Sequence, residues 1–329
     1  MQLSSNSSPT PNYRHVAQGF QFQLGIIAAL FVVFIWSAWL IAVRYSSSSA
    51  LQILDLALMR YAIPAFILFP FVWKARQQIK QTSKSYLVGI TLGAGIPFFY
   101  LTATGLKLAP VVHAGLLIPG TFPVFVTLIA MVFFKEPINP KRLTGLAMIL
   151  LGVLILLLPT LLNQQMSVLK GDLMLIGASA CWAVYTVSMR VAGLPPLAAT
   201  GVLCICSSLV LIPFSMFGIL ESGIAQVSSS EWMMQLVIQA IGAGLLAGFF
   251  YGFAINRLGA ENTSAIGSLT PVVAGLAAIP ILGEALSLAA LIGMLSIFLG
   301  VMKASGLKLT KGDLVSKVRK SFSRDSLSS

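Results

Sequence analysis

Hydrophobic residues form long runs along almost the whole chain, and short polar segments separate one run from the next. A run of about 20 apolar residues is long enough to cross the ~30 Å hydrocarbon layer of a membrane as an α-helix. A transmembrane β-barrel would instead show short segments in which apolar and polar residues alternate. The pattern predicts an all-α polytopic membrane protein with ten spans, at residues 24–44, 51–73, 86–106, 110–134, 143–161, 171–191, 197–220, 233–256, 262–282 and 287–305.

The composition agrees with a membrane protein. Hydrophobic residues make up 57% of the 329 residues and charged residues only 9%, whereas a soluble domain has roughly 25% charged residues. The loops between the predicted spans are too short to hold an extramembrane catalytic domain. Two segments lie outside the spans. We expect residues 1–23 to form a disordered polar arm and residues 306–329 to form a basic tail.

The positive charges are distributed unevenly between the two sides of the predicted membrane region. If the N-terminus is cytoplasmic, 17 Lys and Arg residues fall in cytoplasmic segments and 3 in external loops, while Arg60 lies within a span. Because Lys and Arg accumulate in cytoplasmic loops, we expect both termini to be cytoplasmic and the protein to lie in the inner (cell) membrane. The net charge of +12 therefore reports orientation, and we expect no nucleic-acid partner.

The chain repeats itself at an offset of 148 residues. The stretch FKEPINPKRLTGLAMILLGV, residues 134–153, aligns with LGEALSLAALIGMLSIFLGV, residues 282–301. The matched pairs include Glu136 with Glu284, Gly145 with Gly293, and Gly152 with Gly300. Because five predicted spans separate the two copies, the second copy would be inverted in the membrane relative to the first.

The beginnings of the two halves also match. WSAWLIAVR, residues 36–44, and WAVYTVSMR, residues 182–190, each have a Trp followed eight residues later by an Arg. Pro123 and Pro271 each precede the repeated Glu by thirteen residues. We therefore expect two inverted five-helix repeats, residues 24–161 and 162–305, around a central cavity. Transport by alternating access is the function that this architecture favours, although duplication kept for packing and channel function remain alternatives.

These features resemble the EamA family of the drug/metabolite transporter superfamily over residues 24–305. The resemblance rests on the Trp-then-Arg segments, Arg60, the repeated Pro and Glu positions, and the paired glycines of the fifth and tenth spans. Where the family often has Gly-Glu after the fourth span, this chain has Lys135-Glu136, and Gly283-Glu284 keeps the pattern. The resemblance implies ten helices around a central cavity and the export of small metabolites, often amino acids.

Arg60 and several aromatic residues are the main candidates for substrate binding. Arg60 lies near the middle of a span, where a charge costs at least ~2.5 kcal/mol and needs a partner or water. It could contact a substrate carboxylate or serve as a structural tie to a neighbouring helix. Trp36 and Trp39, like Trp182 and Tyr185, are three residues apart and share a helix face, so they could line a cavity or simply pack.

Five further polar or aromatic residues complete the expected site: Tyr100, His113, Gln239, Tyr251 and Ser268. His113 could take part in proton coupling or be a structural histidine whose hydrogen bonds are satisfied. Pro97 removes a backbone donor and could kink the third span. Gly244, Gly248 and Gly252 form a stripe of small residues, for which helix packing and a homodimer are both open.

We therefore expect a secondary transporter that exports small metabolites, amino acids or related compounds above all, with a proton or an exchanged counter-substrate as the coupling partner. A membrane-embedded lipid-handling protein or enzyme is the alternative, but it would need polar residues clustered at one bilayer face. A third reading is a non-transporting interaction partner. Nucleophile-elbow, P-loop and HExxH motifs are absent, so we expect no enzyme, no catalytic residue, no cofactor and no metal site.

Overall fold

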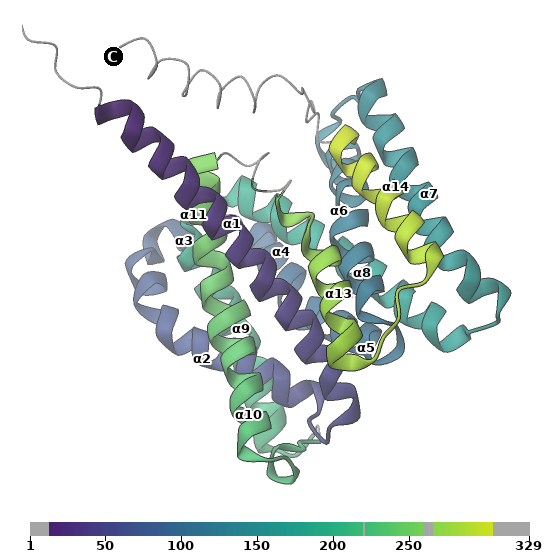
Figure 1. Ribbon diagram of the computed structural model, residues 1–329. Helices are drawn as coiled ribbons and strands as arrows, with labels where there is room; N and C mark the ends of the chain where they lie inside the picture. Colours follow the sequence, from purple (N-terminus) through teal and green to yellow (C-terminus); the bar gives the residue numbers. More distant parts are fainter. Residues whose placement is uncertain (1–12, 220, 259–262, 264–265, 305–329) are drawn as a thin grey trace, which may run out of the picture.

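The computed structural model describes residues 13–219, 221–258, 263 and 266–304, and this part of the chain is helical without any strand. The expected basic tail, residues 306–329, and residues 1–12 of the expected arm lie outside the described residues. Figure 1 shows the helices packed side by side as a bundle. The elements are α1 (Tyr13–Tyr45), η1 (Ser46–Ser48), α2 (Ile53–Lys74), α3 (Arg76–Gln81), α4 (Lys84–Ala94), α5 (Ile96–Leu108), α6 (Val111–Phe134), α7 (Pro140–Leu162), α8 (Met166–Ala192), α9 (Pro196–Met216), η2 (Ile224–Gln226), α10 (Ser229–Leu236), η3 (Val237–Leu246), α11 (Ala247–Leu258), α13 (Thr270–Leu282) and α14 (Leu288–Ala304).

Eight helical stretches among the described residues are long and apolar enough to cross a membrane. Three of them are composite: α1 with η1, α4 with α5, and α10 with η3 and α11. The remaining apolar helices, α13 and α14, lie where the last two spans are predicted, but they are shorter. The chain is therefore a multi-pass α-helical membrane protein, and the number of ten spans stays a prediction.

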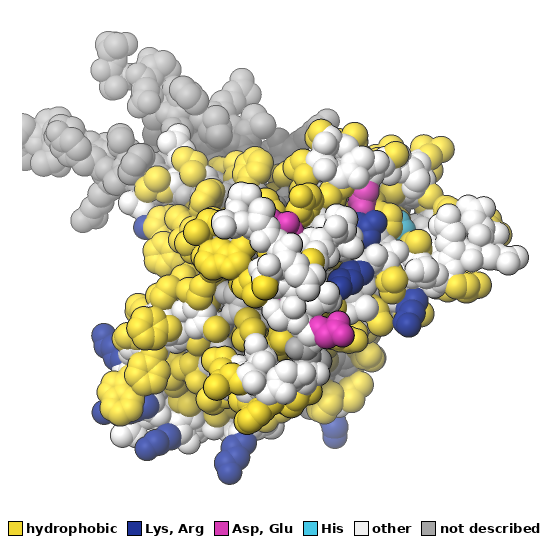
Figure 2. Space-filling view, turned by 90° about the horizontal axis from the view of Figure 1, so that it is seen from below, with side chains coloured by type: hydrophobic (Ala, Val, Ile, Leu, Met, Phe, Trp, Pro, Cys, Tyr) yellow, Lys and Arg dark blue, Asp and Glu magenta, His cyan; other side chains and the backbone are white. Residues whose placement is uncertain are grey.

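Large hydrophobic side chains lie on the outside of the bundle. Phe66 is 86% exposed, Phe133 is 76% exposed and Phe217 is 79% exposed. Figure 2 shows hydrophobic side chains over much of the face seen from below, with Lys and Arg side chains at its left and lower edges and in a group toward its right side. Such a surface is unfavourable in water and suits contact with lipid chains, because lipid replaces the water that apolar side chains would otherwise order.

The first helix begins earlier than expected. Residues 1–23 were expected to form a disordered arm, but α1 starts at Tyr13 and runs without interruption to Tyr45. α1 therefore begins within the segment for which an arm was expected. Pro11 precedes the helix, and the segment after it has no further proline, so nothing in its backbone chemistry stops the helix from extending beyond the apolar run.

The third predicted span is broken into two helices. α4 ends at Ala94, and α5 begins at Ile96 with Pro97 in its first turn, after Gly95 leaves the helical conformation with φ −89° and ψ −141°. Proline lacks the N–H that a continuous helix would need there. The Tyr61 hydroxyl donates to the Ala94 carbonyl at 2.9 Å, which satisfies an acceptor at the break. The kink expected from Pro97 is therefore present.

The eighth predicted span contains a wider helix in its middle. α10 and α11 are ordinary α-helices, but the ten residues of η3 between them form a π-helix. π-Helical segments are rare and occur frequently at functional sites, because the extra residue per turn shifts the side chains that follow. In this protein the segment contains Gln239, one of the expected site residues.

α7 and α14 pack against each other through glycines. A Cβ atom added at Gly145 would lie 2.7 Å from the carbonyl oxygen of Gly300, and one added at Gly152 would lie 2.8 Å from that of Gly293. As the residue number rises along α7 it falls along α14, so the two helices are antiparallel. The repeated glycines of the sequence are therefore a close helix–helix contact, of the kind that only residues without a side chain allow.

Two further helix pairs run parallel. The Ser37 hydroxyl on α1 donates to the carbonyl of Thr270 on α13 at 3.3 Å. The Ser179 hydroxyl on α8 donates to the carbonyl of Ile118 on α6 at 2.7 Å. In each pair, one partner carries a repeated Trp segment in its C-terminal part and the other is followed by a repeated Glu, so these contacts join equivalent helices of the two sequence repeats.

Candidate functional site

An aromatic cluster lies where α1, α5 and α8 meet. We define it as Trp39, Phe98, Phe99, Trp182 and Tyr185. The Trp39 ring stacks on Phe98 with 6.2 Å between centroids, and Phe98 lies 5.1 Å from Trp182. Trp182 in turn lies 5.1 Å from Tyr185, the residue one helical turn further along α8. Three of the expected site residues are thus brought together through Phe98, and Phe99 packs against Trp39 with 6.4 Å between ring centroids.

Arg60 projects from α2 into this cluster. Its guanidinium carbon lies 4.6 Å from the centroid of the Trp39 ring and 5.9 Å from that of Phe99, distances at which a cation is attracted to an aromatic face. Its Nη1 atom is buried and has no hydrogen-bond partner. Within the described part of the chain, Arg60 has no acidic partner. A cation held among rings without a counter-charge is the most unusual feature of the site.

Asp55, the acid nearest to Arg60 in sequence, is occupied elsewhere. One of its oxygens accepts from the backbone N–H groups of Gln52 and Gly223, both at 2.9 Å, and the other accepts from the Ser222 hydroxyl at 2.5 Å. These bonds tie the start of α2 to the segment between α9 and α10. The carboxylate is 3% exposed and does not neutralise Arg60.

Gln239 joins the cluster through a buried hydrogen bond. Its side-chain oxygen accepts from the indole Nε1 of Trp39 at 2.9 Å. Its amide nitrogen donates to Gln235 at 3.3 Å, and the Gln235 amide donates to the carbonyl of Ala42 on α1 at 2.7 Å. Two buried glutamines thus fix the orientation of the Trp39 ring. Gln235 is not among the residues expected from the sequence, although its position four residues before Gln239 puts both on one helix face.

A second aromatic pair lies one helical turn earlier along α1. The rings of Trp36 and Tyr251 are 5.3 Å apart, and Tyr251 comes from α11. Trp36 and Trp182 therefore have different aromatic partners, although they occupy matching places in the sequence repeat. Trp36 and Tyr251, both expected site residues, are half-buried in the bundle.

Two expected site residues lie apart from the aromatic cluster. Tyr100 is 52% exposed, because it follows Phe98 by two residues on α5 and successive helical residues turn by about 100°, so it points away from the buried face. Ser268 is half-buried just before α13. The structure does not bring either residue to Arg60.

His113 forms a buried pair with Asp172, an acid that is not among the expected site residues. Its Nδ1 atom lies 2.7 Å from Oδ1 of Asp172, joining the first turn of α6 to α8. The Asp172 side chain is fully buried, and its second oxygen has no partner. The signal available in the sequence was that Asp172 is an acidic residue at the start of the span predicted at residues 171–191. His113 is therefore hydrogen-bonded, near one end of the bundle and outside the aromatic cluster.

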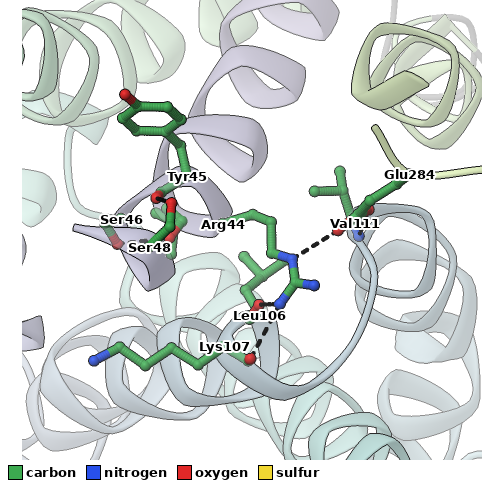
Figure 3. A network of polar contacts seen from close by, with 9 residues as sticks. Arg44, Tyr45, Ser46, Ser48, Leu106, Lys107, Val111 and Glu284 are labelled. Carbon is green, nitrogen blue, oxygen red and sulfur yellow. Dashed lines mark hydrogen bonds and ion pairs between the residues drawn. The ribbon is translucent and has the colours of Figure 1, made fainter. Parts of the chain in front are cut away.

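An ion pair lies at the end of the bundle at which α1 stops, which we call the Arg44 end (Figure 3). Nε of Arg44 lies 2.6 Å from Oε1 of Glu284. Nη1 of Arg44 also donates to the carbonyls of Leu106 at 2.7 Å and Lys107 at 3.0 Å. The other oxygen of Glu284 accepts from the backbone N–H of Val111 at 2.7 Å. Four segments of the chain, α1, α5, α6 and the turn after α13, are thus tied together.

The opposite end, at which α8 stops, is called the Arg190 end. α8 must end there because its beginning pairs with the beginning of α6 through Asp172 and His113, and α6 begins at the Arg44 end. A polar cavity of about 400 Å³ lies at the Arg190 end, between the α3–α4 segment and the residues that follow α8. Its lining includes Gln78, Ser83, Tyr86, Gly193 and Leu194.

Comparison with known proteins places these features in a family. The sequence pattern of the EamA-like transporter family matches the chain twice, at residues 23–158 and 169–305. The uncharacterized transporter YyaM of Bacillus subtilis (strain 168) is 26% identical over 235 residues, which are 70% of this chain and 76% of YyaM. A "probable amino-acid metabolite efflux pump" of Salmonella typhimurium is 25% identical over 281 residues, 83% of this chain and 92% of the pump.

A solved crystal structure has the same fold. It superposes with a TM-score of 0.57 at 21% identity, covering 87% of this chain and 98% of its own. The family resemblance expected from the repeated motifs is thereby confirmed, because the family pattern covers both halves of the chain. With its apolar helices and its transporter relatives, the chain belongs to the EamA-like transporter family of membrane transporters.

Proposed function

We propose that this protein exports small metabolites that carry a carboxylate, amino acids above all, and that Arg60 receives the carboxylate. The observation that carries the proposal is the partly buried guanidinium of Arg60, whose Nη1 has no hydrogen-bond partner. A charge inside a membrane protein is expensive unless it is paired. A substrate carboxylate would supply the missing acceptor and the missing counter-charge in one group.

The surroundings of Arg60 also suit an amino-acid substrate. The rings of Trp39, Phe99 and Tyr61 lie around the Arg60 guanidinium and are buried in this structure, so a substrate that reached Arg60 would meet apolar, aromatic surroundings. The Gln239 bond holds the Trp39 ring in place, so the site is preorganised on this side. The name of the Salmonella typhimurium relative agrees with this substrate class.

Alternating access of two inverted five-helix halves is the mechanism that we propose. The antiparallel glycine contacts support it. In the repeat, Gly145 corresponds to Gly293 and Gly152 to Gly300, whereas in space Gly145 lies on Gly300 and Gly152 on Gly293. A twofold axis between α7 and α14 would exchange the two contacts, as inverted halves require.

We further propose that the protein lies in the cell (inner) membrane with both termini in the cytoplasm. The excess of Lys and Arg in the segments assigned to that side supports this orientation. The Arg190 end would then face the cytoplasm and the Arg44 end the outside. A proton or an exchanged counter-substrate would drive export, and His113 is the residue through which protons could act.

Counterflow in proteoliposomes tests the proposal. Vesicles are preloaded with one amino acid at equal pH on both sides, and uptake of the labelled compound is followed. We expect exchange by the natural protein and a loss of at least tenfold in Arg60→Gln. Amine analogues that lack the carboxylate should not be exchanged. Flux that appears only under a pH gradient would assign proton coupling.

Arg76 provides a matched control. Its guanidinium also lies over a tryptophan, 5.0 Å from the Trp73 centroid, but on an exposed helix end. Arg76→Gln should keep the exchange rate of the natural protein. Wild-type exchange by a folded Arg60→Gln variant, judged by its elution profile and thermal midpoint, would overturn the role given to Arg60.

A further inference from the structure

Both partners of the Arg44–Glu284 ion pair have counterparts in the sequence repeat. Arg44 and Arg190 each follow a repeated Trp by eight residues, at the end of α1 and near the end of α8. Glu284 follows α13 and Glu136 follows α6, and each lies thirteen residues after a repeated Pro. Arg190 and Glu136, at the Arg190 end, are thus the counterparts in the sequence repeat of the Arg44–Glu284 pair.

The backbone turn that connects α6 to Glu136 has the same conformation as the turn that connects α13 to Glu284. Lys135 and Gly283 both adopt the left-handed conformation, with φ of 53° and 69°. The backbone N–H of Glu136 then donates to Ala130 at 3.2 Å, and that of Glu284 donates to Ala278 at 3.3 Å. Because the local backbone is the same, local structure does not explain any difference between the two glutamates.

The helix pairs that carry these residues also share one register. Ser37 on α1 bonds to Thr270 on α13. One helical turn earlier in the repeat numbering, Ser179 on α8 bonds to Ile118 on α6. The middle of each pair is therefore packed alike, and any difference must arise in the C-terminal parts of these helices.

At those C-terminal parts the two ends differ. The side chains of Arg44 and Glu284 are only 24% and 16% exposed and form an ion pair. Arg190 and Glu136 are both exposed, and neither forms an ion pair or a side-chain hydrogen bond with any described residue. The Arg44 end is thus tied, as Figure 3 shows, while the matching residues at the Arg190 end are free of one another.

We propose that Arg190 and Glu136 form a gate ion pair in the opposite state of the transport cycle, when the Arg44–Glu284 pair is broken. The proposal rests on the alternating-access mechanism given above. If the two halves exchange conformations, each end in turn takes the arrangement now seen at the other. Breaking one pair is then offset by forming the other, which keeps the two states close in free energy.

The two glutamates therefore bias the cycle in opposite directions. Glu284→Gln weakens the closed Arg44 end and should shift the protein toward the state with the Arg190 end closed. Glu136→Gln removes the pair of the other state and should shift it the opposite way. Because Glu136 is exposed and its side chain has no partner among the described residues, Glu136→Gln should fold like the natural protein.

Spin-label distances measured in proteoliposomes test this. The cysteines Cys181, Cys204 and Cys206 are first replaced by Ala, and label pairs are placed at Tyr45 with Ala285 and at Pro137 with Val191. We expect Glu284→Gln to raise the short-distance fraction of the second pair at least threefold, and Glu136→Gln to lower it. Lys107→Gln is the control, because only the backbone carbonyl of Lys107 joins the network.

Opposite shifts by the two variants support the gate. Equal distance distributions in all variants, or shifts in the same direction, would overturn it. The measurement needs no substrate, so it is separable from the substrate proposal. Opposite shifts without amino-acid exchange would keep the gate and reject the substrate class, whereas exchange that depends on Arg60 without opposite shifts would do the reverse. As a second test, Arg190→Glu with Glu136→Arg should restore the distribution that either single variant alters.

Discussion

Gly152 on α7 lies directly against Gly293 on α14, so that a Cβ atom added to either would come within 2.9 Å of the other's carbonyl oxygen. Such a distance is shorter than real side chains tolerate. It is one of two glycine–glycine contacts between these antiparallel helices, the other being that of Gly145 with Gly300. Because glycine alone permits this approach, side chains at these positions control how closely the two sequence repeats meet.

Gly152→Leu should therefore destabilise the protein. The new side chain would meet backbone atoms of α14, which cannot move aside as a flexible side chain can. We expect a cost of about 2 kcal/mol or more, seen as a lower midpoint of thermal unfolding in detergent. An unchanged midpoint would contradict the close α7–α14 contact.

Gly248→Leu is the matched control and also tests for a homodimer. A Cβ atom at Gly248 would meet nothing within 4 Å, whereas one at Gly244 would meet Pro64 on α2. The glycine stripe therefore has one packed and one open part. We expect Gly248→Leu to keep the thermal midpoint. If the open part holds a second copy of the chain, the same variant should lower the molecular mass measured by light scattering.

Lys135→Gly should stabilise the protein. Lys135 has φ of 53°, a conformation that costs a residue with a Cβ atom about 1 kcal/mol more than it costs glycine. The equivalent turn has Gly283 with φ of 69°. We expect a higher midpoint of thermal unfolding for Lys135→Gly. The reverse change, Gly283→Lys, should lower the midpoint by a similar amount. If both changes shifted the midpoint in the same direction, this explanation would be contradicted.

His113→Ala should destabilise the protein more than loss of a side chain alone would. The Asp172 carboxylate would then lie fully buried without its one hydrogen bond, since its other oxygen already has no partner. Breaking a buried pair in this way costs about 3 kcal/mol. The expected result is a marked drop in the thermal midpoint.

The double variant His113→Ala with Asp172→Asn serves as the control for this charge effect. Replacing the carboxylate by an amide removes the buried charge, so part of the lost stability should return. If the double variant is less stable than His113→Ala, the buried charge is not the cause of the loss, and another role of Asp172 must account for it.

Asp55→Ala should loosen the junction between α2 and the segment before α10. Three donors, from Gln52, Ser222 and Gly223, lose their acceptor. We expect a loss of about 2 kcal/mol, because buried or half-buried donors are left without partners. Ser222→Ala, which removes only one of the three donors, should cost less. Hydrogen exchange at the Gly223 amide should rise in Asp55→Ala and stay low in Ser222→Ala.

Much of the helix pattern could be predicted from the sequence, because a membrane helix is specified locally by its apolar length. α6, at Val111–Phe134, lies within one residue of the span predicted at 110–134. The start of α8 at Met166 was missed by five residues, since polar residues such as Ser167 and Lys170 continue the helix beyond the apolar run. The break at Gly95 was accessible because proline chemistry is also local.

The site was only partly predictable, because it depends on contacts between distant segments. Residues on one helix face, such as Trp182 and Tyr185, could be grouped by spacing alone. The bridging place of Phe98 between Trp39 and Trp182 needs the packing of three helices. The Arg44–Glu284 pair joins residues 240 positions apart, and no local pattern signals such a partner.

Arg60 makes the two sequence repeats differ in charge. α9 follows the first helix of the second repeat as α2 follows that of the first, yet α9 contains no charged residue. Of the two helices that occupy this place in the sequence repeats, only α2 thus carries a partly buried cation. A substrate anchored to α2 by its carboxylate would keep the same heading relative to that helix throughout the cycle. The carboxylate end of the substrate would then point toward one side of the membrane and its other end toward the opposite side. The binding affinity for a substrate that enters from one side would therefore differ from the affinity for one that enters from the other.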